Sequence, residues 1–87
     1  MDNTEIIIYG TNWCGDCRRT RRFLDMQQIE YLWINIDQDI QAEKLVFKLN
    51  KGMRSVPTLV FPDGTILVEP SNAALAEKLE TIVNGAN

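Results

Sequence analysis

The chain has 87 residues, of which 45% are hydrophobic and 24% charged, and its formal net charge is -3. A chain of this length predicts a single domain over residues 1–87 with only a modest core. The acidic balance gives no electrostatic case for binding nucleic acid, and no stretch reaches the roughly 18–20 apolar residues of a membrane span.

The first residues, MDNTEIII, carry acid rather than base and run directly into an apolar stretch. They lack the basic region and the cleavage site of a signal peptide. We therefore expect a cytoplasmic protein, in a compartment where thiols are normally kept reduced. Cysteines in such a compartment are more often catalytic than structural.

The first half of the chain predicts a strand, a helix and a second strand. Glu5–Tyr9 is short, apolar and rich in β-branched residues, which favours a buried strand. A turn follows at Gly10-Thr11-Asn12. From Cys14 to about Gln27 there is no proline, which favours a helix that opens at the cysteines, and Tyr31–Asn35 reads as the second strand.

The second half predicts a helix and then a hairpin. Gln38–Leu49 has apolar residues mostly at helical spacing, and Gly52 is a plausible stop. Strands are expected at Thr58–Phe61 and Ile66–Val68, because the turn Pro62-Asp63-Gly64 separates them.

Pro70-Ser71-Asn72 opens a last helix, with Ser71 as the expected N-cap. The element order is then β-α-β-α-β-β-α. The first two strands are joined through a helix, so they should be parallel. The hairpin completes a four-stranded mixed sheet with three helices, which is an α/β fold.

The only cysteines, Cys14 and Cys17, lie three positions apart in the segment NWCGDCRRTRR. Side chains at this spacing on a helix share nearly one face, so both sulfurs can reach one disulfide. We expect an exposed first thiol at the helix N-terminus, where the dipole favours the thiolate. The wheel positions predict Cys14 as the nucleophile and Cys17, beside the buried face, as the resolving thiol.

Four arginines follow within five positions, at Arg18, Arg19, Arg21 and Arg22. Arg18, one turn from Cys14, is expected to stabilise the thiolate. Asp16 is expected to oppose it and to pair with Arg18 or Arg19. The alternative is that these charged residues form an ordinary solvated helix face.

Two neighbouring features frame the cysteines. Trp13 offers either a flat apolar surface to a partner or a simple cover over the helix end. Pro57, in Ser55-Val56-Pro57-Thr58, precedes a strand and cannot donate to its ladder. The background rate of about 5–6% for cis X-Pro bonds predicts a trans bond here.

The chain resembles the thioredoxin superfamily, and more closely its glutaredoxin-like branch of the small mycoredoxin type. The residues that carry the resemblance are YGTNWCGDC at 9–17, RSVPT at 54–58, the FPDG hairpin and the following PSNAAL. The resemblance covers nearly the whole chain. It implies the fold described above, with a cis bond before Pro57 and that proline beside the cysteine pair.

The resemblance also implies a substrate groove. The Val56 backbone would pair with an extended thiol substrate, and the helix N-terminus at Ser71 and Asn72 would receive a substrate carboxylate. The substrate-binding residues are expected to be Trp13, Arg54, Ser55, Val56, Pro57, Ser71 and Asn72. The alternatives are that Ser71 is a plain N-cap and Arg54 a solvated loop residue. Thr11 and Glu69-Pro70 depart from the lysine and the Gly-Gly pair of many glutathione-using relatives.

The sequence thus predicts a thiol–disulfide oxidoreductase that reduces protein disulfides or mixed disulfides with a small thiol. No bound cofactor is expected, and the co-substrate is a thiol such as glutathione or mycothiol. Expected partners are disulfide-containing proteins and a flavin-dependent reductase, with the chain acting as a monomer. One alternative is electron donation to ribonucleotide reductase. Another is a dimer that binds an iron–sulfur cluster, since two cysteines and no histidine cannot close a four-ligand metal site in one chain.

Overall fold

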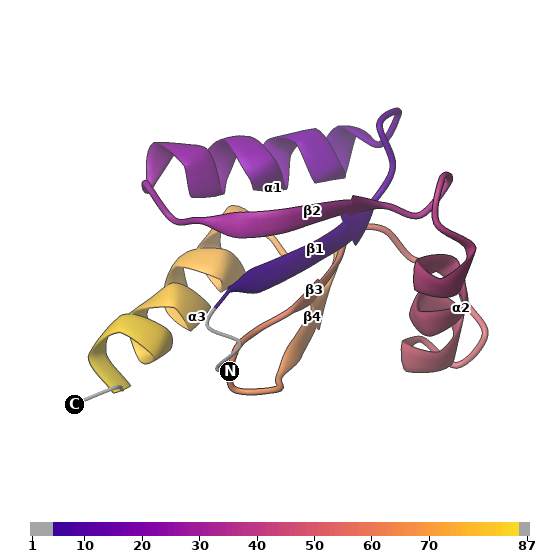
Figure 1. Ribbon diagram of the computed structural model, residues 1–87. Coiled ribbons are helices and arrows are strands. Elements are labelled where there is room, and N and C mark those ends of the chain that lie inside the picture. Colours follow the sequence, from indigo (N-terminus) through magenta and orange to yellow (C-terminus); the bar gives the residue numbers. More distant parts are fainter. Residues whose placement is uncertain (1–4, 86–87) are drawn as a thin grey trace.

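The computed structural model describes residues 5–85, which form the seven predicted elements in the predicted order (Figure 1). The elements are β1 (Ile6–Gly10), α1 (Gly15–Met26), β2 (Tyr31–Asn35), α2 (Ile40–Leu49), β3 (Thr58–Val60), β4 (Ile66–Val68) and α3 (Asn72–Gly85). None of the helices in this part of the chain is long and apolar enough to cross a membrane.

The four strands form one mixed sheet in the order β2-β1-β3-β4. β1 runs parallel to β2 and antiparallel to β3, and β3 pairs antiparallel with β4. Ile8 of β1 therefore faces Trp33 on one side and Leu59 on the other. The predicted α/β fold with a four-stranded mixed sheet is confirmed.

The two faces of the sheet carry separate apolar clusters, because alternate residues of a strand point to opposite faces. Ile6 and Ile8 belong to the cluster that packs under α1 and α3, whereas Tyr9 belongs to the cluster under α2. The first cluster contains Ile6, Ile8, Leu24, Leu59, Phe61, Leu75 and Leu79, and the second contains Tyr9, Ile36, Ala42 and Val46. Helices α1 and α3 thus cover one face, and α2 covers the other (Figure 1).

Several element ends differ from the prediction by one or two residues, and two of these differences have clear local reasons. α2 begins at Ile40 rather than Gln38, because Asp39 is the N-cap and its carboxylate accepts a hydrogen bond from the Ala42 N–H over 3.0 Å. β3 ends at Val60, because the next residue, Phe61, donates its N–H to the Thr65 carbonyl in the hairpin turn. Neither change moves the cysteines.

The chain leaves the carboxyl end of the central strand β1 at Gly10 and enters α1 five residues later. Ile36, directly after β2, donates its N–H to the Gly10 carbonyl over 2.9 Å. This hydrogen bond ties the segment after β2 to the end of β1, from which the chain runs on to Cys14.

Candidate active site

Cys14 is the N-cap residue of α1, with extended backbone angles (φ -82°, ψ 117°). Its Sγ accepts a hydrogen bond from the Cys17 backbone N–H over 3.1 Å. Its thiol lies 3.8 Å from the Val56 carbonyl, to which it donates. The side chain is 8% exposed, so the prediction of an exposed thiol is wrong: the capping geometry turns the sulfur inward, against the loop that contains Val56.

Cys17 lies in the first turn of α1 and is fully buried. Burial, and next a hydrogen bond with Cys14, raise the pKa of the Cys17 thiol to about 12, while the Thr11 backbone acts in the opposite direction. The negative charge of Asp16 adds a smaller upward contribution. Cys17 is thus held as a neutral thiol beneath Cys14 at neutral pH.

Gly10 makes the space in which the Cys17 sulfur lies. A Cβ at Gly10 would lie 2.6 Å from the Cys17 Sγ and 2.8 Å from the Trp33 ring, closer than real Cβ contacts allow. The sequence reasoning assigned Gly10 to a turn and missed this role. A glycine at the end of an apolar strand, a few residues before the cysteines, is the signal that indicates close approach.

The loop before β3 lies against Cys14, although 42 residues separate Cys14 from Val56. The Val56–Pro57 bond is cis, as the family resemblance implies and against the prediction from the background rate. The Pro57 side chain is fully buried. The Ser55 carbonyl accepts a hydrogen bond from the Thr58 hydroxyl over 2.8 Å, which ties the loop to β3.

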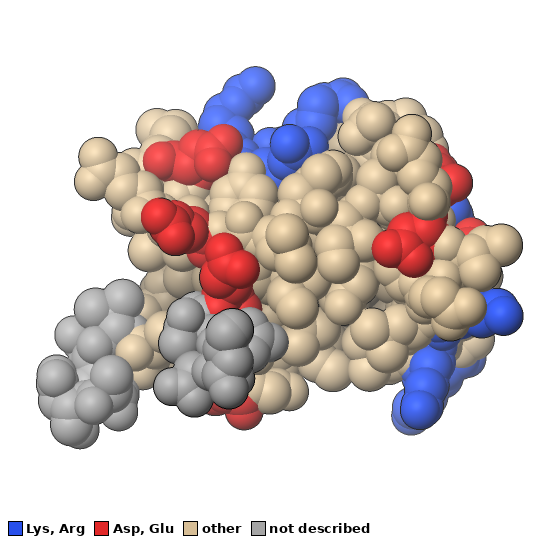
Figure 2. Space-filling view, viewed as in Figure 1, with Lys and Arg blue, Asp and Glu red and all other residues tan. Residues whose placement is uncertain are grey.

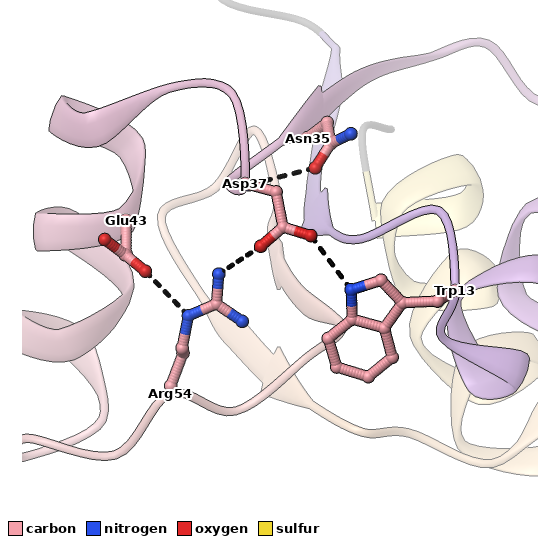
Figure 3. Close-up of polar contacts among 5 residues, drawn as sticks. All are labelled: Trp13, Asn35, Asp37, Glu43 and Arg54. Carbon is pink, nitrogen blue, oxygen red and sulfur yellow. Dashed lines mark hydrogen bonds and ion pairs between the residues drawn. The ribbon is translucent and has the colours of Figure 1, made fainter.

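Trp13 is joined to the loop by a chain of polar contacts, which Figure 3 shows. Its indole N–H donates to Asp37 Oδ2 over 2.9 Å, and the ring remains 66% exposed. The other Asp37 oxygen forms an ion pair with Arg54. The Arg54 Nε also donates to Glu43 over 2.7 Å. These contacts connect the residue before Cys14 with the start of α2 and with the loop before Pro57.

Asp37 is the centre of this network. The Arg54 guanidinium, and next the Trp13 indole, hold the pKa of the Asp37 carboxyl below its usual range. The sequence reasoning named Trp13 and Arg54 but missed Asp37 and Glu43, because nothing local marks which of the many acidic residues faces them. In this structure Arg54 joins Asp37 and Glu43 through two ion pairs, and the side chains of both pairs are only partly exposed.

The start of α3 approaches α1 through Arg19. The Arg19 guanidinium donates to Asn72 Oδ1 over 2.6 Å and to the Pro70 carbonyl over 2.7 Å. The Ser71 hydroxyl accepts from the Ala74 N–H over 3.0 Å, so the predicted N-cap is confirmed. Arg19 was not predicted to take part in the site, because its partners lie more than 50 positions further along the chain.

Asp16 and Arg18 make contacts with other residues than Cys14. Asp16 lies 3.7 Å from the Arg19 guanidinium, which is one of the two pairings expected for it. Arg18 donates to the Asn12 carbonyl over 3.0 Å. The hydrogen bonds of the Cys14 sulfur are instead with the Cys17 N–H and the Val56 carbonyl.

These residues place two thiols at one helix end, one capping it and the other buried beneath it, next to a backbone carbonyl from a cis-proline loop. Within residues 5–85 there is no group of three or more metal-ligating side chains. With its mixed sheet and three helices, this arrangement defines a dithiol protein of the thioredoxin fold class.

Comparison with known proteins gives the family. The glutaredoxin family model matches residues 6–66, which include both cysteines and the proline loop. Mycoredoxin 1 of Corynebacterium glutamicum is 39% identical over 79 residues, which are 91% of this chain and 98% of mycoredoxin 1. The chain belongs to the glutaredoxin family and is a thiol–disulfide oxidoreductase.

Solved structures agree with this assignment. The crystal structure of the glutaredoxin grx-1 from Archaeoglobus fulgidus superposes with a TM-score of 0.66 at 27% identity, covering 93% of this chain and 87% of that one. The crystal structure of the thioredoxin-like protein BC3987 superposes with a TM-score of 0.68 at 23% identity, covering 90% of this chain and 99% of that one. The second likeness concerns the fold alone.

Proposed function

We propose that this protein reduces protein disulfides, or mixed disulfides with a small thiol, by a two-cysteine mechanism. In this proposal Cys14 is the nucleophile and Cys17 the resolving thiol. The observation that carries it is the hydrogen bond from the Cys17 N–H to the Cys14 Sγ. A donor aimed at a sulfur favours its thiolate, and the thiolate is the attacking form.

The reaction proceeds in two exchanges. The Cys14 thiolate attacks one sulfur of the substrate disulfide, a Cys14–substrate disulfide forms, and the other substrate sulfur leaves as a thiolate. Cys17 then gives up its proton and attacks the Cys14 sulfur. The second substrate thiol is released, and Cys14 and Cys17 remain joined by a disulfide. Two electrons pass from the protein dithiol to the substrate.

The high pKa of Cys17 fits this order of events. A thiol with a pKa of about 12 does not compete with Cys14 for the first attack at neutral pH. Two causes of this high pKa, the hydrogen bond with Cys14 and the Cys14 charge, are lost once the Cys14 sulfur is in the mixed disulfide, so the Cys17 pKa falls and its proton passes to water or to the released substrate thiolate. The resolving thiol is therefore activated only after the mixed disulfide has formed.

Substrate binding is assigned to the surface around Cys14. Val56 offers its backbone to an extended substrate in the manner of strand addition. Trp13, Arg54, Ser55 and Pro57 flank it. Ser71 and Asn72, at the start of α3, are assigned to a substrate carboxylate, because a helix N-terminus favours an anion. The support is the position of the Val56 carbonyl, 3.8 Å from the Cys14 sulfur.

The electrons are assigned to a small thiol of the glutathione or mycothiol type, itself kept reduced by a flavin-dependent reductase. Two such thiols reduce the Cys14–Cys17 disulfide and leave as their own disulfide. We propose that residues 1–87 work as one monomeric domain in the cytoplasm, where thiols stay reduced. Similarity to mycoredoxin 1 supports a small-thiol co-substrate of this general class.

The test is a reduction assay on one mixed-disulfide peptide, with glutathione, mycothiol, bacillithiol and a thioredoxin reductase compared as donors. We expect turnover with one or more of the small thiols, and none with the Cys14→Ser variant at the same concentration. Turnover by Cys14→Ser equal to that of the natural protein would remove Cys14 from the mechanism.

A further inference from the structure

The densest positive charge of this acidic protein lies beside the reactive cysteines. Helix α1 carries four arginines and two aspartates, whereas the whole chain has a formal net charge of -3. In Figure 2 one group of blue side chains lies at the top of the molecule, over α1, and another lies at the lower right. The two-cysteine chemistry described above does not require four arginines on α1. We therefore looked for a separate role for these side chains in substrate binding.

Three of these arginines line one hollow on the surface. The hollow has a volume of about 450 Å³, and we call it the arginine groove; its main lining residues are Gly15, Arg18, Arg19, Arg22, Met26 and Asn72. One end of the groove lies next to Cys14, because the lining residue Gly15 directly follows it in the chain. Asn72, the first residue of α3, also lines the groove. The groove ends near Met26, whose side chain is 75% exposed.

The guanidinium groups in the arginine groove are poorly neutralised by the protein itself. Only Arg19 has an ion pair, at 3.7 Å from Asp16. No carboxylate within residues 5–85 lies within ion-pair distance of Arg18 or Arg22. By contrast, Arg54 has two carboxylate partners and Lys78 has one. The positive charges of Arg18 and Arg22 are therefore left for a bound anion, whereas Arg19 is already held by Asp16, Asn72 and Pro70.

The length of the groove limits what fits. The 12 residues of α1 span about 18 Å. That length matches about five residues of extended chain, at roughly 3.3 Å each. The exposed Met26 and the half-buried Phe23 add an apolar surface at the far end. A single small anion would leave most of the groove empty, whereas a short acidic peptide segment would pair with both Arg18 and Arg22 and still contact the apolar end.

We propose that the arginine groove binds an acidic segment of the protein substrate, with carboxylates within about five residues of the cysteine that Cys14 attacks. This inference rests on the proposed function, since it places the substrate disulfide at Cys14. Guanidinium groups pair with carboxylates in bidentate geometry, which orients the segment as well as attracting it. The groove thereby selects disulfides with acidic flanks and speeds their encounter.

The experiment uses two ten-residue peptides, each with one cysteine held as a mixed disulfide with 2-mercaptoethanol. One peptide carries glutamates within five positions on both sides of the cysteine, and the other carries glutamines instead. Single-turnover release of 2-mercaptoethanol or peptide is measured at low and high salt. We expect the acidic peptide to react about tenfold faster at low salt, with most of the difference lost at high salt.

The matched variants are Arg22→Glu and Lys48→Glu, which change the net charge equally. Lys48 is exposed on α2, on the other face of the sheet. We expect Arg22→Glu to abolish the preference for the acidic peptide and leave the glutamine peptide unaffected. We expect Lys48→Glu to keep most of the preference. Far-UV circular dichroism checks that both variants fold.

Three outcomes would overturn this inference while leaving the proposed function intact. Equal rates for the two peptides at low salt would show that the groove does not select acidic flanks. Equal effects of Arg22→Glu and Lys48→Glu would assign the preference to overall charge. Salt-sensitive dimerisation that Arg22→Glu removes would assign the groove to a second copy of the chain. If neither peptide is reduced, the proposed function fails, and this inference with it.

Discussion

The Cys17 backbone N–H donates to the Cys14 Sγ over 3.1 Å, so the residue that carries the second thiol also orients the first. Cys14 is 8% exposed and Cys17 is fully buried. Cys14 is therefore the less buried of the two cysteines, and its sulfur has a backbone N–H donor.

This contrast predicts the order of reactivity. At pH 7 the Cys17→Ser variant, which keeps Cys14, should react with iodoacetamide at least about tenfold faster than Cys14→Ser, which keeps Cys17. Alkylation is followed by intact mass. Faster alkylation of Cys14→Ser would reverse the proposed roles.

The raised pKa of Cys17 also predicts how stability depends on pH. The folded-state pKa is about 12 and the ordinary value for this thiol is 9.0, so folding favours the protonated form. The stabilisation is present below about pH 9 and is lost as the pH rises toward 12. Between pH 8 and pH 10 the reduced protein should lose about 1 kcal/mol more of its free energy of unfolding than Cys17→Ser does. Urea unfolding of both reduced proteins measures this, and parallel curves would contradict it.

Gly10 supplies a prediction about packing. Gly10→Ala should lower the free energy of unfolding by about 1–3 kcal/mol, because its Cβ would press on the Cys17 sulfur and the Trp33 ring. Gly15→Ala is the matched control, since a Cβ there meets nothing within 4 Å and alanine is the better helix residue. Denaturant unfolding that ranks Gly15→Ala as the less stable variant would refute the close-packing account.

The network around Asp37 predicts a positioning effect. Asp37→Ala removes the partner of Trp13 and one of the two carboxylate partners of Arg54. The value of kcat/KM for a peptide disulfide should fall about two- to fivefold, or roughly 0.5–1 kcal/mol. Stability should change little, because exposed ion pairs contribute about 0–1 kcal/mol. Asp63→Ala, which loses an ion pair with Lys78 and two hydrogen bonds from Thr65 but no contact with Trp13 or Arg54, is the control.

A spectroscopic measurement separates positioning by Asp37 from a general structural effect. With 5-fluorotryptophan in the protein, Asp37→Ala should shift the ¹⁹F resonance of Trp13 and leave that of Trp33 in place. Trp33 packs instead against Arg21, whose guanidinium carbon lies 4.2 Å from the ring centre. Movement of both resonances by the same amount would point to a general change of structure.

Ser71 allows the N-cap role to be separated from the proposed substrate role. Ser71→Ala should cost about 1 kcal/mol, since the bond to the Ala74 N–H is lost. Ser71→Asp should keep the cap and the stability, because aspartate caps equally well. It should nevertheless raise KM for a small-thiol disulfide, since its charge repels a substrate carboxylate. An unchanged KM in Ser71→Asp would leave Ser71 as an N-cap alone.

Much of the fold could be predicted from local sequence signals. The strand Tyr31–Asn35 and the strand Ile66–Val68 lie where the apolar runs predicted them. The predicted end of β1 at Tyr9 was one residue too early, because Gly10 reads as a turn residue but pairs with Asn35 in the parallel ladder. Only tertiary pairing decides whether such a glycine closes the strand or follows it.

The site was predicted only where its residues are marked by a local pattern. The spacing of Cys14 and Cys17 brought both thiols to one helix end, as expected. The inward turn of Cys14 was not predicted, because it depends on Val56, 42 positions away. Asp37 was not predicted for the same reason, because its partners Trp13 and Arg54 lie in two other segments of the chain. The cis bond before Pro57 followed from family resemblance, since the background rate predicts the opposite.

The most direct test of the two-cysteine account is to trap the intermediate. Cys17→Ser and Cys14→Ser are each mixed with a protein disulfide substrate, and the products are read by intact mass under non-reducing conditions. We predict a stable one-to-one covalent adduct with Cys17→Ser, joined through Cys14, and no adduct with Cys14→Ser. An adduct formed by Cys14→Ser in equal or greater yield would contradict the assignment of Cys14 as the nucleophile.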